Sequence, residues 1–353
     1  MEKETKLIEV DSLQPEKEKI TLAAEILRQG GVVAFPTETV YGLGANGLEQ
    51  QAVEKIFQAK GRPSDNPLIL HVASWEEVGK LVSAWPREAE ILARKFWPGP
   101  LTMVLPKKGH IPSAVTAGLD TVAVRIPNHP VALALIRQAG IPLAAPSANL
   151  SGKPSPTTAC HVLKDLWGKI DMIIDGGSTG IGLESTVIDL TTNVPLILRP
   201  GGVTLEELEK ELGKIEIDPA LGKLLAKDLT PRSPGMKYTH YSPDADVILL
   251  IGEDQTKVQK KMKEMAISEE KKGKRVGLMI IGQVTEDFSA SIVKSMGLEG
   301  DLETIAANLY QLLREMDRQG VDLILVEGVN YEGLGLAIMN RMEKAAGHQI
   351  VRV

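Results

Sequence analysis

Three arginines and one lysine stand near the ends of apolar segments in a chain that is acidic overall. Lys60 and Arg62 precede the apolar segment LILHV, Arg125 lies within VAVRIP, and Arg199 ends PLILRP. Arginine can bind a phosphate or carboxylate through two parallel hydrogen bonds, whereas lysine acts as a mobile point charge. In open α/β sheets, ligands bind at the strand ends. The four cations therefore predict a site for an anionic ligand with several acceptor oxygens.

Polar side chains cluster near the same strand ends, but the cluster lacks a general-base histidine, an activated cysteine and a carboxylate pair. The chemistry is then expected to rest on positioning and charge neutralisation, as in phosphoryl or nucleotidyl transfer. Structural alternatives stay open: an isolated arginine could form a surface salt bridge, His71 could be a core residue, and a Ser or Asn could cap a helix. The polar residues are Thr37, Glu38, Thr39, Ser147, Asn149, Ser151, Ser155, Ser185 and Thr186.

Composition excludes several classes of protein. The 353 residues are 43% hydrophobic and 4% aromatic, with a formal net charge of −6, which argues against a polycationic surface or a base-stacking platform. The single cysteine, Cys160, excludes disulfides and CxxC sites, and the six histidines form no HxH or HxxxH pair. No apolar run approaches the roughly 18 residues needed to span a bilayer, and the charged N-terminus lacks a signal sequence. We therefore expect a cytoplasmic protein without a protein-built metal site.

Two glycine motifs are misleading. Gly42 to Gly47 match GxGxxG, but TETVY separates them from the preceding strand VVAFP, so a glycine-rich turn entering a helix is favoured over a dinucleotide site. Gly176 to Gly180 match GxSxG, yet the following residues indicate a strand where a nucleophile elbow needs a helix. SANLSGKP also departs from the Walker A pattern at both ends. None of these supports a dehydrogenase, serine hydrolase or P-loop ATPase.

The apolar periodicity predicts two α/β domains. Short apolar strands alternate with amphipathic helices over residues 1–212. Residues 213–244 contain a proline-rich stretch without a clean period and are expected to be a linker. Residues 245–353 alternate strand and helix regularly, which predicts a smaller, doubly wound domain with a mostly parallel sheet.

Seven segments in order resemble a known family. They are FPTETVYGLGANG, KGRPSDNPLILHV, WPGPLTMVL, VAVRIPNHP, PLAAPSANLSGKPSPT, GLESTVIDL and LRPGGVT, between about 31 and 204. Together they resemble the YrdC-like domain of L-threonylcarbamoyl-AMP synthases, and the remainder resembles the longer, two-domain members. The resemblance implies a YrdC-like, twisted mixed-sheet α/β domain, then a linker and a smaller Rossmann-like domain.

The resemblance also implies which residues act. The family signature KxR…SxN falls on Lys60, Arg62, Ser147 and Asn149, which are expected to be catalytic. The residues expected to line the threonine and ATP sites are Thr39, Arg62, Asn66, His71, Thr121, Arg125, Ala145, Ser147, Ser155, Ser185 and Arg199.

The implied reaction is a nucleotidyl transfer that converts L-threonine, bicarbonate and ATP to L-threonylcarbamoyl-AMP and pyrophosphate. The cations would hold the mutually repelling anions together, and Mg²⁺ bridging the ATP phosphates would need few protein ligands. By the same resemblance, a partner complex would transfer the threonylcarbamoyl group to tRNA, on the adenosine next to the anticodon.

The linker segment SPGMKYTHYSP suggests a lid. Two tyrosines and a histidine between prolines exceed what a spacer needs, so we expect Tyr238 and Tyr241 to cover the bound substrates and exclude water. The C-terminal domain has no predicted chemistry, although Gly333 and Gly335 lie where a loop enters a helix.

Two alternatives remain at this point. A non-catalytic RNA-binding module would share the basic site but would show salt-dependent RNA binding and no ATP turnover. A carbamoyltransferase of the hydrogenase-maturation type would share the domain, but the single cysteine argues against its zinc segments.

Overall fold

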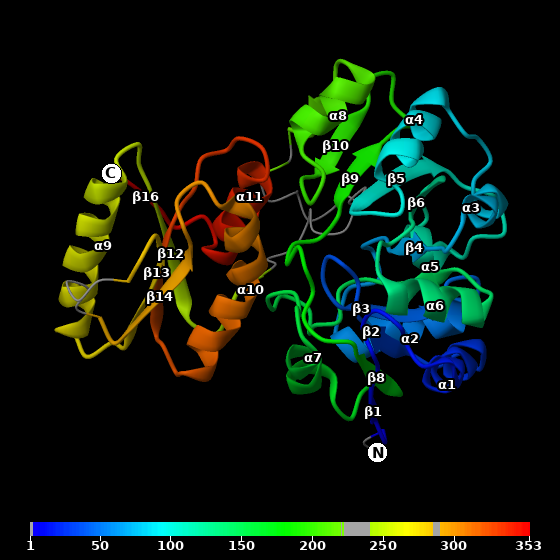
Figure 1. The fold of residues 1–353 in the computed structure, drawn as a ribbon, viewed down its shortest axis with the longest axis horizontal. Helices are drawn as coiled ribbons and strands as arrows, with labels where there is room; N and C mark the ends of the chain where they lie inside the picture. Colours follow the sequence, from blue (N-terminus) through cyan, green and yellow to red (C-terminus); the bar gives the residue numbers. More distant parts are fainter. Residues whose placement is uncertain (1–2, 220, 222–240, 285–289) are drawn as a thin grey trace. The chain divides into compact units, whose positions relative to one another are not determined.

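The computed structural model describes residues 3–219, 221, 241–284 and 290–353. By the contacts between its Cα atoms, the chain divides into two compact units. The first comprises Met1–Ser151 and Ser155–Tyr238, and the second Gly152–Pro154 and Thr239–Val353. Each unit is a sheet covered by helices, as the sequence predicts (Figure 1).

The first unit contains an 11-stranded mixed sheet with the strand order β1-β8-β2-β3-β7-β4-β6-β5-β9-β10-β11. Its strands are β1 (Lys6–Glu9), β2 (Val33–Phe35), β3 (Gly42–Asn46), β4 (Ile69–His71), β5 (Leu101–Pro106), β6 (Thr121–Arg125), β7 (Leu143–Ala144), β8 (Met172–Asp175), β9 (Thr186–Asp189), β10 (Leu196–Arg199) and β11 (Glu216–Ile217). Its helices are α1 (Lys17–Arg28), α2 (Gln50–Lys60), α3 (Trp75–Leu81), α4 (Arg87–Phe96), α5 (Ser113–Thr116), α6 (Pro130–Ala139), α7 (Ala159–Leu166) and α8 (Leu205–Leu212).

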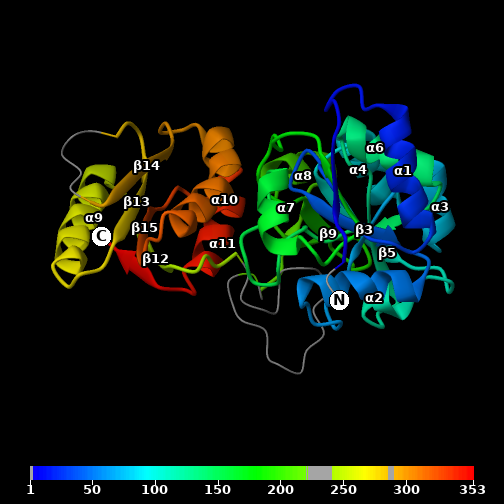
Figure 2. The ribbon, with the colours of Figure 1, turned by 90° about the horizontal axis from the view of Figure 1, so that it is seen from below.

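Strand β2 shows how this sheet divides two hydrophobic cores. Val33 and Phe35 belong to the core shared with α1 and α6, whereas Ala34 belongs to the core on the opposite face. This follows from the two-residue period of a strand, which points successive side chains to opposite faces. Helices α1 and α6 pack together on one side, with α2 on the other (Figure 2). Because β2 is buried on both faces, it is apolar throughout, as its sequence VAF indicates.

The expectation of a glycine-rich turn at residues 42–47 is wrong. Residues Gly42–Asn46 form β3, which pairs antiparallel with β2. The glycines are needed because Phe35 packs directly over this strand: a Cβ on Gly44 would lie 2.7 Å from the Phe35 ring. A Cβ on Gly47, just after β3, would lie 2.5 Å from the Leu70 side chain. These glycines serve close packing within the sheet.

The segment with the GxSxG pattern, by contrast, behaves as the sequence predicts. Residues 176–180 connect β8 to β9, and no helix follows Ser178 before β9 begins. A nucleophile elbow needs a strand, the serine and then a helix. Residues 176–180 therefore do not form a nucleophile elbow.

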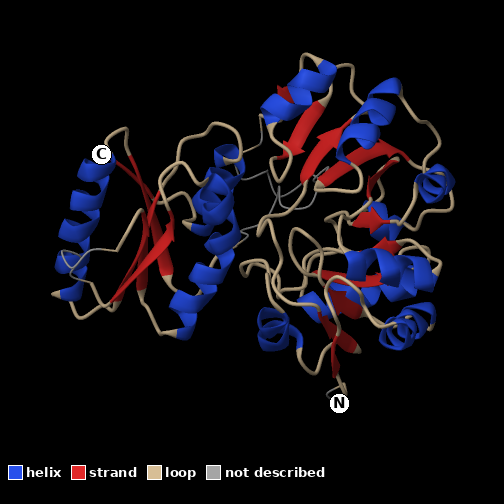
Figure 3. Ribbon diagram, in the orientation of Figure 1, coloured by secondary structure: helices blue, strands red, loops and turns tan. Residues whose placement is uncertain are grey.

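The second unit is a five-stranded, entirely parallel sheet in the order β14-β13-β15-β12-β16. Helix α9 covers one face, and α10 and α11 cover the other (Figure 3). This is the doubly wound arrangement that the regular alternation of strand and helix predicts. The elements are β12 (Asp246–Ile251), α9 (Gln255–Glu270), β13 (Val276–Ile281), β14 (Ile292–Gly297), α10 (Leu302–Arg318), β15 (Leu323–Glu327), α11 (Gly335–Ala345) and β16 (Ile350–Arg352).

The predicted linker at 213–244 is only partly described. Its first residues include β11, which pairs in parallel with β10. Residues 220 and 222–240, including most of SPGMKYTHYSP, lie outside the described residues, so the linker and its role as a lid stay predictions. Within the described ranges, no helix combines the length and the apolar character needed to cross a membrane.

Candidate active site

The turn between β2 and β3 is built by threonine side chains. The Thr37 hydroxyl donates to the carbonyl of Val40 at 2.7 Å and accepts from the amides of Thr39 and Val40 at 3.2 and 3.3 Å. These local bonds fix the backbone without secondary structure, as short hydroxyl side chains often do in turns. The Thr37 and Thr39 hydroxyls lie 2.8 Å apart. The turn thereby holds Thr39 and the intervening Glu38 in defined positions.

Arg125, at the end of β6, lies against this turn. Its guanidinium is 4% exposed and donates to the Gly99 carbonyl and the Thr39 hydroxyl, each at 3.1 Å. Its Nη2 also lies 2.6 Å from Glu38 Oε1. A buried charge is tolerated only when it is paired in this way. The structure thus places a guanidinium and a carboxylate next to each other in the interior of the first unit.

The Arg125–Glu38 pair is close but not aligned. Neither carboxylate oxygen of Glu38, nor Arg125 Nη2, has a hydrogen bond of good geometry to any group in the described part of the chain. Such buried polar atoms are rare in folded proteins and call for an explanation. Both partners therefore retain hydrogen-bonding capacity that a ligand could use.

Lys60 connects the two halves of the KxR…SxN signature. It is the last residue of α2, 2% exposed, and its ammonium donates to the carbonyls of Ser147 at 2.5 Å and Asn149 at 2.6 Å. The Ser147 hydroxyl donates to Asn149 Oδ1 at 2.5 Å. Backbone bonds hold the same loop: Leu43 donates to Pro146 O and Ala148 donates to Tyr41 O, each at 2.8 Å. The signature is thus one connected structure.

Arg62 organises the loop that follows α2. Gly61 ends the helix in the left-handed conformation, with φ 59°, so the chain reverses sharply before Arg62. The Arg62 Nη2 donates to the carbonyls of Asn66 and Pro67 at 3.3 and 3.2 Å. The Asn66 amide is fully buried, and neither its nitrogen nor its oxygen bonds to a described residue. Asn66 is therefore a second place where a ligand would complete the polar contacts.

Arg199 is a second buried arginine, and it is held by Ser185, directly before β9. Arg199 donates through Nε and Nη2 to the Ser185 carbonyl at 3.1 and 2.9 Å, and through Nη2 to the Ser185 hydroxyl at 3.1 Å. That hydroxyl lies 2.8 Å from Thr102 Oγ1. Next to Ser185, the Glu184 carboxylate accepts from Ser155 at 2.5 Å. Three predicted residues, Ser155, Ser185 and Arg199, therefore share one neighbourhood.

His71 is the buried titratable group of the site. It lies in β4 directly opposite Arg125 of β6, so their side chains are on the same face. Burial, followed by the charges of Arg125 and Arg199, lowers the pKa of His71 to about 3. The imidazole is therefore neutral at physiological pH.

Other predicted residues lie differently. Ala145 is buried beside β4, where its amide donates to Ile69 O at 3.0 Å. Thr121 begins β6, roughly 13 Å of strand from Arg125. Tyr241 belongs to the second unit, where its ring stacks on Tyr310 at 5.4 Å. Its expected contact with substrate stays a prediction, and Tyr238 lies outside the described residues.

Sequence reasoning missed three contributors. The sequence indicates Glu38 only as one of the polar residues at strand ends, and Glu184 and Thr102 only as members of the family segments. The available signal was the position of each carboxylate: both stand among apolar and hydroxyl residues, where a surface glutamate is not expected.

The whole chain matches known proteins. A family profile described as "Telomere recombination" matches residues 25–201, and one described as "Threonylcarbamoyl-AMP synthase, C-terminal domain" matches residues 203–347. The threonylcarbamoyl-AMP synthase of Pyrococcus abyssi is 55% identical over 96% of this chain and 97% of its own length. That of Bacillus subtilis is 50% identical over 97% of both. This chain belongs to the threonylcarbamoyl-AMP synthase family.

Members of this family are nucleotidyltransferases, and the predicted fold and family are confirmed. A crystal structure of P. abyssi Sua5 complexed with L-threonine superposes on this chain with a TM-score of 0.94 and 53% identity. The superposition covers 99% of this chain and the whole of the P. abyssi chain. The family thus extends across both units of the chain.

The Lys60 contacts predict that this residue supports folding as well as activity. Lys60→Met would retain the apolar stem but leave the Ser147 and Asn149 carbonyls without their donor. We expect the first unit to lose about 2–4 kcal/mol of unfolding free energy, together with its activity. Urea unfolding followed by tryptophan fluorescence measures this, because all four tryptophans lie in the first unit. Lys80→Met, at an exposed position, is the control, and equal unfolding midpoints for the two variants would contradict the role.

The depressed pKa of His71 predicts a pH-dependent stability. As the pH falls below about 6.5, His71 takes up a proton in the unfolded chain. In the folded chain it stays neutral down to about pH 3. The free energy of unfolding should therefore fall, by up to about 1.4 kcal/mol per pH unit, as the pH drops through this window. His71→Gln removes this slope, whereas His110→Gln, at an exposed position, keeps it. Parallel stability curves for wild type and His71→Gln between pH 6.5 and 4.5 would refute the assignment.

Proposed function

We propose that the first unit makes L-threonylcarbamoyl-AMP from L-threonine, bicarbonate and ATP, releasing pyrophosphate and water. The observation that carries this proposal is the buried pair of Arg125 and Glu38 beside the Thr39 hydroxyl. A fixed guanidinium and a fixed carboxylate match the two charges of an amino acid zwitterion. Threonine would present its carboxylate to Arg125 and its ammonium to Glu38.

The poor alignment of the ion pair supports this placement. The buried oxygens of Glu38 and the Nη2 of Arg125 lack well-directed partners among the described residues, so a zwitterion would add hydrogen bonds without breaking strong ones. Hydrogen bonds between charged groups contribute about 1.5–3 kcal/mol each. The burial of the pair would strengthen both contacts, because water does not screen them.

The proposed reaction has two steps. The threonine ammonium loses one proton, and the resulting amine attacks the carbon of bicarbonate; the nitrogen then loses a second proton, which leaves with the bicarbonate hydroxyl as water and gives an N-carboxylate. A carboxylate oxygen then attacks the α-phosphorus of ATP, and the bond to the β-phosphate oxygen breaks to release pyrophosphate. Glu38 would accept a proton from the ammonium. The reaction needs no covalent enzyme intermediate, which agrees with the residues present.

The remaining cations and neutral donors would hold the triphosphate. We propose that Arg62 and Arg199 neutralise phosphate charge, while the Asn66 amide and the neutral His71 hydrogen-bond without adding charge. Lys60, by holding Ser147 and Asn149, would shape the wall that faces ATP. Such fixed donors stabilise developing charge without reorganising during the reaction.

The binding of Mg²⁺ together with ATP stays a prediction. Over the part of the chain that the structure describes, no group of three His, Cys, Asp or Glu side chains could hold a metal ion. Mg²⁺ commonly binds mainly to phosphates and water. We further propose that the product passes to a transfer complex that modifies tRNA, in the cytoplasm.

Pyrophosphate release tests the function. We expect release only when ATP, threonine and bicarbonate are all present, and release without threonine or bicarbonate would refute the proposal.

Arg125→Lys keeps the charge but loses the guanidinium geometry, so kcat/KM for threonine should fall about ten- to a hundredfold. Arg137→Lys, on the exposed face of α6, is the matched control. Unchanged threonine kinetics in Arg125→Lys would show that threonine binds elsewhere.

A further inference from the structure

The second unit contains a cavity at the carboxyl ends of its parallel strands. Its volume is about 1010 Å³, at the upper end of the range found for small-molecule sites. The lining includes Ile251 from the end of β12, Ile281 from the end of β13, and Glu327 from the end of β15. Ligands of open α/β sheets bind at this edge. The cavity is therefore placed where a doubly wound domain holds a ligand.

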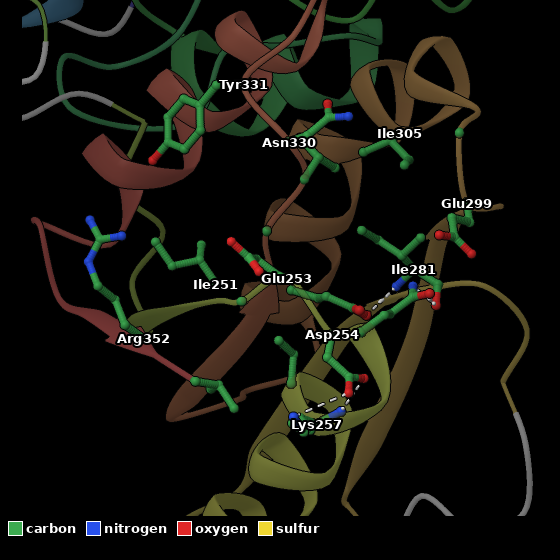
Figure 4. Close-up of a pocket in the computed structure, with 18 of the residues that line it drawn as sticks. Ile251, Glu253, Asp254, Lys257, Ile281, Glu299, Ile305, Asn330, Tyr331 and Arg352 are labelled. Atoms are coloured by element: carbon green, nitrogen blue, oxygen red, sulfur yellow. Dashed lines mark hydrogen bonds and ion pairs between the residues drawn. The ribbon is translucent and has the colours of Figure 1, made fainter.

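Charge in this cavity is predominantly negative. Four carboxylates line it, those of Glu253, Asp254, Glu299 and Glu327, against the two cations Lys257 and Arg352. Lys257 lies 3.6 Å from Asp254, so these two offset one another. Figure 4 shows Glu253 and Glu299 on separate loops, apart in the view. Neither of them forms an ion pair within the described ranges.

Glu327 adds a buried carboxylate at the cavity floor. Its Oε2 accepts from the Ile281 amide at 2.7 Å and from Gln259 Nε2 at 3.0 Å. Burial raises the pKa of Glu327, and the Glu299 carboxylate adds to the rise. A cation bound in this part of the cavity would be attracted by both carboxylates.

Phosphate-containing ligands do not suit this cavity. The N-terminus of α9, a usual phosphate site, is already capped by the Asp254 carboxylate, which accepts from the Lys257 amide at 3.2 Å. The N-terminus of α10 is capped in the same way by Asp301, 3.1 Å from the Thr304 amide. A nucleobase would lack a stacking platform, since Tyr331 is the one aromatic residue in the lining. Its hydroxyl already donates to Glu343 at 2.6 Å.

The remaining lining matches an aliphatic cation. Ile251, Ile281 and Ile305 add apolar side chains to the lining, with Ile251 on the side of Glu253 and Ile281 and Ile305 on the side of Glu299 (Figure 4). Ammonium groups joined by alkyl segments would place charge at the carboxylates and methylene groups on the isoleucines. We propose that this cavity binds a linear polyamine, with its ammonium groups on Glu253, Glu299 and Glu327. The site lies entirely in the second unit and does not depend on the function proposed for the first.

Calorimetric titration of the full chain with spermidine tests the proposal. We expect saturable binding that weakens with salt, and no binding of triethylene glycol, a neutral molecule of similar length. The double variant Glu253→Gln/Glu299→Gln should bind spermidine at least about tenfold more weakly. Both side chains are exposed, so the fold should be retained, which circular dichroism checks.

Glu264→Gln, an exposed change on α9 outside the cavity, is the matched control for general attraction to an acidic protein. It should bind spermidine as the wild type does. Equal affinity in the double variant and this control would overturn the proposal, as would the absence of saturable binding. Saturable binding of inorganic phosphate that is lost in the double variant would also overturn it.

Discussion

A guanidinium buried beside a carboxylate is the constraint on which the first unit depends. Removing Arg125 from water is costly unless the protein supplies partners, and it supplies Glu38, Thr39 and the Gly99 carbonyl. Those partners come from the turn after β2 and the segment before β5, so the sheet must bring these segments to β6. The Thr37 bonds hold the turn in the shape that allows it. An ion pair whose groups lie close together but are poorly aligned leaves hydrogen-bonding capacity for a ligand that carries both a positive and a negative charge.

Strand order explains how distant motifs meet within the first unit. Strands β3, β7, β4 and β6 are neighbours in the sheet, although β7 follows β6 in the chain. This crossover sets the Ser147 loop beside β3 and opposite the end of α2, where Lys60 closes the contact. The close packing of Gly44 under Phe35 keeps β2 and β3 near enough for the turn to form. Each signature residue is therefore held by contacts that are remote in sequence.

Several of these features could be predicted from the sequence, and others could not. The segments VAF and ILH indicate buried strands, because each of their residues is compatible with a sheet covered on both faces. The regular alternation of strand and helix after residue 245 indicates a doubly wound unit. The glycines of Gly42–Asn46 predict a turn because glycine is usually a turn signal, and only the position of Phe35 shows why a strand needs glycine here. The sequence does not predict that Glu38 pairs with Arg125, because the two residues are 87 positions apart in the chain. The acidic cavity of the second unit arises only when loops after different strands converge.

The proposed recognition of a zwitterion by the Arg125–Glu38 pair can be tested directly by calorimetry with two ligands. L-Threonine carries both charges, whereas 3-hydroxybutanoate is the same molecule without its amino group. The account predicts that Glu38→Gln weakens threonine binding about tenfold or more and leaves 3-hydroxybutanoate binding unchanged or stronger. Equal weakening of both ligands, or unchanged threonine affinity, would contradict the assignment of the ammonium to Glu38.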